Sequence, residues 1–448
     1  MNSSRYDTAG FKPVLVMGLP ILAEIFLRTL IGNVDQFMLS RFSDTAVAAV
    51  SNANQVINLG IIVLDVVCVA TTIILAQYIG AKQHEKANKL CTLSIGLIAI
   101  LSVVLSLTLS LKGEFFLNLM HIPPELMAEA KTYLLIVGLS LILQGFFMAY
   151  SAIFRSFAMM KEIMYISVGM NIINVAFNYV LINGKFGFPR LGVAGAATAT
   201  LLSRVVGVVI IAILFVKQLH LHLDFKYLCK PEFKAIKQML SVGFPAAGDS
   251  ISYNCMQMVI LSFVNICGSK SVTARVYVNM IVVFVFMYTS AIGTATQIHV
   301  GYLVGAGNAD NAKKLVTKSV LSGIVVSEIL STLLYVFRDS VFTIFTKDTE
   351  ILSIISSVLL VEIFLELGRA INIVMIKSLL AAGDTKFPLY MAVLSQWGTA
   401  VPLAYFFGLH LGMGLTGIWI GLAVDEWCRA LAFILRWRSN KWKEKRLI

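Results

Sequence analysis

Residues 90–111 read LCTLSIGLIAILSVVLSLTLSL, a run of 22 residues without a charged side chain. A transmembrane α-helix needs about 20 consecutive apolar residues to cross the hydrocarbon core of a bilayer. A strand of a membrane β-barrel would instead alternate polar and apolar residues over about ten positions. Because this run is apolar on nearly all sides, it predicts a membrane-spanning helix.

The composition extends this prediction to the whole chain. Of the 448 residues, 58% are hydrophobic and 13% are charged, and the mean hydropathy is +0.84. A soluble chain of this length needs about a quarter of its residues charged to cover its surface. We therefore predict an all-α polytopic membrane protein with twelve transmembrane helices, at residues 13–40, 48–79, 90–111, 131–153, 163–183, 191–216, 239–265, 273–304, 316–337, 351–379, 386–408 and 413–437.

Basic residues are divided unevenly between the predicted loops, and the formal net charge is +12. One set of alternate loops, together with the two chain ends, holds 23 Lys and Arg residues, whereas the opposite loops hold 8. The positive-inside rule then places both termini in the cytoplasm and the helices in a cell membrane. Anionic lipid headgroups, and not nucleic acid, are the expected contact of these charges.

The two halves of the chain repeat one another. At an offset of 225 residues, segment 18–90 aligns with segment 243–315 without a gap, and 14 of the 73 positions are identical, including Gly80 with Gly305. Each repeat holds six predicted helices, so both enter the membrane in the same direction. Parallel repeats of this kind form two-lobed transporters with the substrate path between the lobes. We predict an N-terminal lobe at 1–216, a basic cytoplasmic linker at 217–238, and a C-terminal lobe with a basic cytoplasmic tail at 239–448.

The first predicted helix carries a polar stripe. Glu24, Arg28, Gly32 and Asp35 are spaced at i, i+4, i+8 and i+11, which places them on one helix face. Ionisable side chains at bilayer depth are costly unless they are paired or face a cavity, so each is a candidate site residue. Glu24 and Arg28 either line the cavity or form an ion pair that only fixes packing. Asp35 has no base within a turn of its own helix, which favours a functional role.

Further polar residues of the N-terminal lobe are expected at the depth of this carboxylate. Three asparagines of the fifth predicted helix share one face, and a tyrosine and a threonine lie near the same level on the fourth and sixth. They are either oxygen ligands for a proton or a sodium ion, or interhelical hydrogen bonds, which average under about 1 kcal/mol each in membranes. The candidate cation-coupling residues are Asp35, Asn174, Asn178, Tyr133 and Thr200.

The C-terminal lobe has its own polar set. Asp249, Tyr253 and Gln257 occupy the repeat positions of the stripe on the first helix. Glu366 and Arg369 lie one turn apart on the tenth predicted helix, where mutual neutralisation favours a packing role. The candidate substrate and cavity residues of both lobes are Glu24, Arg28, Asn171, Asp249, Tyr253, Gln257, Glu366 and Arg369.

Other features of the sequence argue against enzymatic chemistry. It contains no phosphate-binding loop, nucleophile elbow or HExxH motif, and its six Cys have no metal-ligand spacing. Asp425, Glu426 and Arg429 near the chain end are interpreted as a local charge cluster outside the site. We therefore expect no enzyme activity, no cofactor and no bound metal, and transport driven by an ion gradient.

Several stretches, in order and repeated in both halves, resemble one family. They are IGNVDQFMLSRFSDTAVAAV at 31–50, AQYIGAKQ at 76–83, LGVAGAATAT at 191–200, VGYLVGAGNADNAKKL at 300–315 and SLLAAGDTKFP at 378–388. Over nearly its whole length the chain resembles the multidrug and toxic compound extrusion (MATE) family. The resemblance implies two six-helix bundles in a V, which exchange cytosolic drug-like cations for external protons or sodium ions. It also implies that Asp35 matches the acidic coupling residue of the first helix.

The chain departs from the family pattern at the coupling positions. Asn178 stands where many members carry an acid on the fifth helix, and an amide binds no proton at physiological pH. Tyr253 and Arg369 stand where sodium-coupled relatives carry acids, with Asp249 and Glu366 one turn away. The coupling ion is therefore open between H⁺ and Na⁺, with a slight preference for a proton at Asp35. We expect small organic substrates and a functional monomer.

The arginines within the predicted membrane helices leave a second function open. A flippase for lipid-linked oligosaccharides or other amphiphiles, which resembles this fold distantly, is expected to line its cavity with several guanidinium groups. The four arginines that keep this alternative open are Arg28, Arg204, Arg275 and Arg369.

Overall fold

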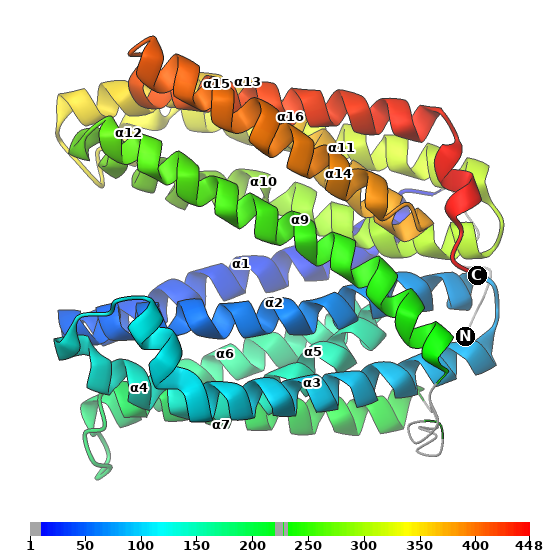
Figure 1. Cartoon of the computed structure of the whole chain (residues 1–448), viewed down its shortest axis with the longest axis horizontal. Helices are drawn as coiled ribbons and strands as arrows, with labels where there is room; N and C mark the ends of the chain where they lie inside the picture. The colour runs from blue at the N-terminus through cyan, green and yellow to red at the C-terminus, as the bar shows by residue number, and fades with distance from the viewer. Residues whose placement is uncertain (1–9, 220–226, 228–231) are drawn as a thin grey trace. The chain divides into compact units, whose positions relative to one another are not determined.

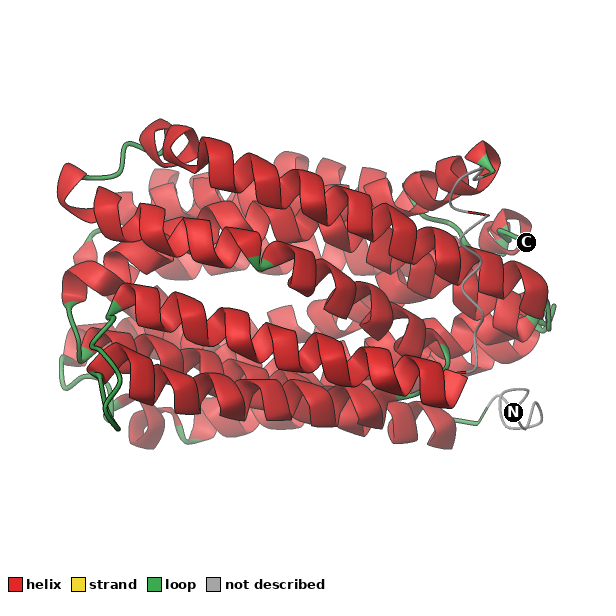
Figure 2. Ribbon diagram, turned by 90° about the horizontal axis from the view of Figure 1, so that it is seen from below, coloured by secondary structure: helices red, strands yellow, loops and turns green. Residues whose placement is uncertain are grey.

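The computed structural model describes residues 10–219, 227 and 232–448, and the side chains of residues 31–36 and 44 also lie outside the described part. Throughout the described residues the chain forms helices joined by turns, without strands (Figure 2). The predicted all-α class is confirmed.

The helices follow one another closely along the chain (Figure 1). The N-terminal half contains α1 (Lys12–Ser40), α2 (Asp44–Gly80), α3 (His84–Leu119), α4 (Pro124–Leu139), α5 (Leu141–Ser156), α6 (Met160–Asn183), α7 (Val193–Leu214) and the π-helical η2 (Phe215–Leu219). The C-terminal half contains α9 (Phe233–Ile266), α10 (Ser269–Gly305), α11 (Ala309–Val336), α12 (Arg338–Phe342), α13 (Thr349–Ala382), α14 (Lys386–Ser395), the π-helical η3 (Gln396–Ala400), α15 (Val401–Tyr405), the π-helical η4 (Phe406–His410), α16 (Gly414–Arg438) and the 3-10 helix η5 (Lys441–Lys445).

Many of these helices are long and apolar enough to cross a membrane. Eight qualify within the described residues, and nine if the bent pair α4 and α5 is one span. The chain is therefore a multi-pass membrane protein, and the total of twelve spans stays a prediction. Two predicted helices are interrupted: the range 131–153 falls on α4 and α5, which meet at 44°, and 386–408 is divided by π-helical turns next to Pro402. Proline removes a backbone donor, and local π-helical adjustment is how a membrane helix accommodates it.

The predicted loop positions of three lysines are wrong. α3 runs from His84 to Leu119, so Lys86, Lys89 and Lys112 lie within a helix. Lysine is a good helix former, and Lys89 is stabilised there by Glu85 one turn earlier, at 2.7 Å. The predicted linker 217–238 is helical at both ends, in η2 and in α9, while residues 220–226 and 228–231 lie outside the described part.

The chain divides into two compact units. Unit 2 comprises Ala23–Leu75 and Gln83–Gly243. Within it α7 packs against α4, α5 and α6, and α3 packs against α4 and α5 (Figure 1). Its core includes buried side chains from α2, α4 and α7, such as Ala53, Tyr133 and Ala197.

Unit 1 comprises Met1–Leu22, Ala76–Lys82 and Phe244–Ile448. Here α13 is the central helix, since it packs against α10, α11 and α16. This position surrounds its polar residues with protein. Because the unit limits cut through α1 and α2, they do not coincide with the predicted lobes at 1–216 and 239–448, which stay predictions.

The basic C-terminal tail folds back onto unit 1. Trp442 is buried and stacks on Trp437, with ring centroids 4.1 Å apart. Arg446 Nη2 donates to the carbonyl of Gly305 at 2.5 Å, and the backbone N–H of Leu447 donates to Gln77 Oε1 at 3.1 Å. The tail is therefore held by the end of α10 and the end of α2.

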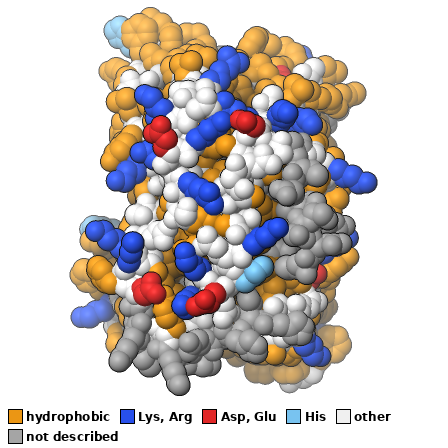
Figure 3. All heavy atoms as spheres, turned by 90° about the vertical axis from the view of Figure 1, so that its right-hand side faces the viewer, with side chains coloured by type: hydrophobic (Ala, Val, Ile, Leu, Met, Phe, Trp, Pro, Cys, Tyr) orange, Lys and Arg blue, Asp and Glu red, His pale blue; other side chains and the backbone are white. Residues whose placement is uncertain are grey.

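One face of the molecule is rich in Lys and Arg side chains and has few acidic ones (Figure 3). It is the face at which the C-terminus lies. Lys443 of the tail pairs there with Asp310 at 2.9 Å. An excess of basic groups at one end of a helical membrane protein is what the positive-inside rule describes.

Candidate functional site

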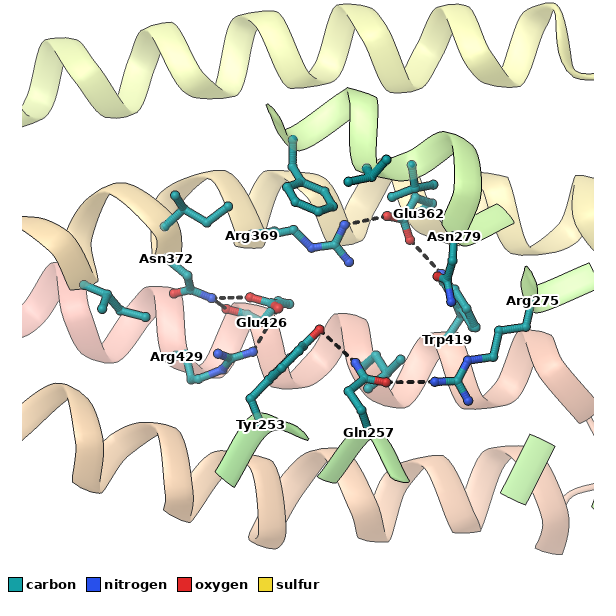
Figure 4. A pocket seen from close by; sticks show the side chains of 16 residues that line it. Tyr253, Gln257, Arg275, Asn279, Glu362, Arg369, Asn372, Trp419, Glu426 and Arg429 are labelled. Atoms are coloured by element: carbon teal, nitrogen blue, oxygen red, sulfur yellow. Dashed lines mark hydrogen bonds and ion pairs between the residues drawn. The ribbon is translucent and has the colours of Figure 1, made fainter. Parts of the chain in front are cut away.

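A cavity of about 590 Å³ lies inside unit 1 (Figure 4). Four helices supply its wall. Its polar and aromatic lining consists of Tyr253 and Gln257 from α9, Arg275, Asn279 and Phe286 from α10, Glu362, Arg369 and Asn372 from α13, and Trp419, Glu426 and Arg429 from α16. Along α13 and α16 these residues recur three or seven positions apart, which keeps them on one helix face.

The first ionic group of the wall centres on Arg369. Its Nη1 donates to Glu362 Oε1 at 2.8 Å and also bonds Glu366 on the same helix. The other oxygen of Glu362 accepts from the indole Nε1 of Trp419 at 2.6 Å. The guanidinium also lies over the ring of Phe286, 5.3 Å from its centroid. The predicted pair of Glu366 with Arg369 forms, and Glu362 is engaged at both oxygens.

The second ionic group centres on Arg429. Its Nη2 bonds Asp425 Oδ2 at 2.6 Å and Glu426 Oε1 at 2.9 Å. The remaining oxygen of Glu426, Oε2, accepts from Asn372 Nδ2 at 2.6 Å. Ser395 adds a bond to Asp425 at 2.5 Å. Buried charges are costly unless they are paired. Each charge of this group is paired, and Arg429 Nε is buried without a hydrogen-bond partner among the described residues.

A third chain of hydrogen bonds crosses the floor of the cavity, and Arg275 is its only charged member. Arg275 Nη2 donates to Gln257 Oε1 at 2.9 Å, and Gln257 Nε2 donates to the hydroxyl of Tyr253 at 2.8 Å. Figure 4 shows these three side chains in line, coming from α9 and α10. Arg275 thus has a neutral partner, unlike the other two arginines of the wall.

In unit 2 the structure brings three predicted coupling residues together. Asn178 Nδ2 donates to Asn174 Oδ1 at 3.3 Å, and Asn174 Nδ2 donates to Thr200 Oγ1 at 3.4 Å. Both asparagines are buried, and they join α6 to α7. Tyr133 is buried in the apolar core of the same unit, beside Val193 and Ala197.

The predicted stripe on α1 is only partly described. The side chain of Asp35 lies outside the described residues, and Arg28 is exposed. Of the two alternatives left open for Glu24 and Arg28, their ion pair does not form, because the buried carboxylate of Glu24 bonds Arg155 Nη2 of α5 at 3.1 Å. Ser167 Oγ is a further donor to Glu24, at 3.5 Å.

The comparisons with known proteins identify the family. The family model described as MatE matches residues 20–180 and 245–406. The chain belongs to the MATE family. It is 38% identical to an uncharacterised transporter, YisQ, of Bacillus subtilis, over 95% of this chain and 94% of that protein. It is 26% identical to a probable multidrug resistance protein, NorM, of Thermotoga maritima, over 98% of this chain and 94% of that one.

Solved MATE structures have the same fold. A crystal structure described as MATE in the bent conformation superposes with a TM-score of 0.90 at 20% identity, over 98% of this chain and 97% of that one. Its identity is low, so the likeness concerns the fold alone. Together with the relatives, it makes this MATE protein a membrane transporter rather than an enzyme.

Sequence reasoning found part of this MATE protein's cavity. Tyr253, Gln257 and Arg369, three of the candidate residues, line it, and Glu366 bonds Arg369. Asp249 lies apart from the lining, half-buried, with Gln396 Nε2 3.4 Å from its Oδ1. Asn171 of α6 is half-buried in unit 2.

Other residues were missed. The exclusion of Asp425, Glu426 and Arg429 from the site is wrong, because the last two line the cavity. The seven-residue spacing of Trp419 to Glu426 was the signal that could have placed them on the cavity face. Asp65 was overlooked within α2, an apolar-rich helix of 37 residues.

Proposed function

We propose that this MATE protein is a cation-coupled antiporter that exports organic, drug-like compounds by alternating access. The cavity in unit 1 carries the proposal. Its volume of about 590 Å³ lies within the usual range of small-molecule sites, roughly 300–1,000 Å³. Ionisable residues inside membrane helices mark substrate and ion pathways, and here they stand beside the aromatic walls of Phe286 and Trp419. Several relatives are named multidrug resistance proteins, and the family resemblance favours cationic compounds.

The coupling ion is proposed to bind in the N-terminal half, at Asp35. The buried cluster of Asn174, Asn178 and Thr200 supplies amide and hydroxyl oxygens in the same unit. An ionised Asp35 with such oxygens suits Na⁺, and Asp35 alone suits H⁺. We propose that occupation of Asp35 by the ion from outside favours substrate release, and that Tyr133 supports this site through the packing of α4 on α7.

We further propose that the protein works as a monomer in a cell membrane, with both termini in the cytoplasm. The basic face at the C-terminus supports this orientation, because Lys and Arg are retained on the cytoplasmic side (Figure 3). Anionic headgroups of the inner leaflet would then meet this face.

The test is ethidium efflux from energised cells. Cells producing the native protein are compared with cells producing Asp35→Asn, with sodium present or absent and with the proton gradient intact or collapsed. Asp339→Asn is the matched control, because that side chain is 77% exposed and far along the chain from the candidates. Efflux that requires one gradient and Asp35 supports the proposal and names the ion. Undiminished efflux by Asp35→Asn would overturn the assignment of the coupling site.

A flippase for amphiphiles with anionic headgroups is the second candidate. The observation in its favour is that Arg275 and Arg369, two of the four predicted arginines, line the cavity together with Arg429. Arg204 instead bonds Ser140 in unit 2, at 2.6 Å. A disruption strain separates the two functions: drug sensitivity favours the exporter, and envelope defects favour the flippase.

A further inference from the structure

The charged groups that line the cavity differ in how many hydrogen-bond and ion-pair partners they have. The carboxylates of Glu362 and Glu426 both line it, and each has both oxygens engaged by fixed donors. For Glu362 these donors are Arg369 and Trp419, and for Glu426 they are Arg429 and Asn372. A cationic ligand therefore meets no open carboxylate oxygen on these two residues. It could bind there only by displacing a bond that already exists.

Arg275 differs from the other two arginines of the wall. Among the residues that the structure describes, it forms no ion pair, and its partner is the neutral amide of Gln257. One of its guanidinium nitrogens, Nη1, is buried and lacks a hydrogen-bond partner there. A buried charge without a counter-charge is costly. An anionic group in the cavity would remove this cost.

The orientation of Gln257 leaves a second donor beside Arg275. A guanidinium only donates hydrogen bonds, so the amide must turn its oxygen towards Arg275. The amino group of Gln257 is then left for Tyr253, whose hydroxyl has to accept. The hydroxyl proton of Tyr253 is therefore available to another acceptor, and this residue is 40% exposed at the cavity.

From this geometry we infer that the cavity binds its ligand through an anionic group, held by Arg275 and the hydroxyl of Tyr253. The aromatic side chains of Phe286 and Trp419 in the same wall suit a flat aromatic body. The ligand class is therefore an aromatic carboxylate, either zwitterionic or anionic overall. This inference rests on the proposed export of organic compounds, and it replaces the cationic compounds that the family resemblance favours with compounds that carry a carboxylate.

The test compares two dyes that differ in a single group. Rhodamine B carries a free carboxylate, and its ethyl ester does not. Binding to the purified native protein in detergent is followed by fluorescence anisotropy. We expect rhodamine B to bind more tightly than the ester. Arg275→Gln should lower the affinity for rhodamine B by about 10-fold or more and change the affinity for the ester by less than about 2-fold. The reason is that a hydrogen bond to a charged group is lost only for rhodamine B.

Two further variants keep the test decisive. Tyr253→Phe removes only the hydroxyl and should lower the affinity for rhodamine B by about 3-fold or more. Arg338→Gln is the matched control in the same unit, because Arg338 bonds the carbonyl of Tyr335 and is not part of the cavity wall. The Arg338→Gln variant should bind both dyes with the affinity of the native protein. Size-exclusion profiles confirm folding of each variant.

The inference is overturned if the native protein binds the two dyes equally or binds neither, or if Arg275→Gln and Tyr253→Phe weaken both dyes alike. The binding measurement needs no ion gradient. Absence of gradient-dependent efflux of both ethidium and rhodamine B would therefore contradict the proposed function while the dye preference stands, and the reverse result would contradict only the inference.

Discussion

Gly80 and Gly305, which are equivalent in the two sequence repeats, each pack against the backbone of the other's helix. A Cβ on Gly80 would collide with the backbone of Tyr302, and a Cβ on Gly305 would collide with that of Gln77. The ends of α2 and α10 therefore cross reciprocally within unit 1. Small residues let membrane helices approach this closely.

Gly80→Ala should therefore destabilise the protein. The clash is with backbone, which cannot turn away like a side chain, and overpacking of this kind costs typically about 1–3 kcal/mol. The measurement is thermal unfolding of the purified protein in detergent. The control is Gly169→Ala in α6, where a Cβ meets nothing within 4 Å. That change should be neutral or slightly stabilising, since alanine is the better helix former. Equal effects of the two substitutions would contradict the close crossing.

The ion pair of Glu24 with Arg155 should stabilise unit 2. Arg155→Met leaves the carboxylate of Glu24, which is buried, without its counter-charge. Removing one partner of a buried pair costs up to about 3–5 kcal/mol, and less here because Arg155 is partly exposed. Adding Glu24→Gln to Arg155→Met removes the unpaired charge and should restore much of the loss. A double variant less stable than the sum of the single ones would contradict the pairing.

Gln77 should hold the C-terminal tail in place. It is fully buried, and its amide bonds the carbonyl of Ala381 at 2.7 Å and the N–H of Leu447 at 3.1 Å. Gln77→Leu removes both bonds, and a buried polar group that loses its partner costs about 1–3 kcal/mol. We expect faster cleavage of the tail by trypsin at Lys441–Lys445, measured by mass spectrometry. Gln83→Leu, in the turn after α2, is the control and should not change the cleavage rate. Unchanged cleavage in Gln77→Leu would show that the tail is held elsewhere.

The helical fold was predictable because a long run of apolar residues is enough to identify a membrane-spanning helix. A run such as residues 90–111 has no other stable structure in a bilayer. The interruptions were not predictable, since the bend at Ser140 and the π-helical turns before and after α15 depend on packing rather than on hydropathy.

The candidate site was predictable only along single helices. Spacing placed Glu366 and Arg369 on one face, and they do bond. Partners on different helices carry no such signal. The sequence therefore suggested Arg28 as the partner of Glu24, one turn away, whereas the fold supplies Arg155. In the same way, the sequence placed Glu426 outside the site, whereas in the fold its helix α16 packs against α13.

The last prediction concerns Asn178, whose amide bonds Asn174 inside unit 2. A carboxyl group can exchange a proton, whereas an amide cannot. Asn178→Asp therefore places a titratable group within the proposed coupling cluster. We expect ethidium efflux by this variant to depend more steeply on pH than efflux by the native protein. Asn183→Asp is the matched control, because Asn183 ends the same helix in an exposed position and bonds the carbonyl of Tyr179. A pH profile that changes equally in both variants would place the coupling ion away from Asn178, whereas a change confined to Asn178→Asp would place this cluster on the ion path.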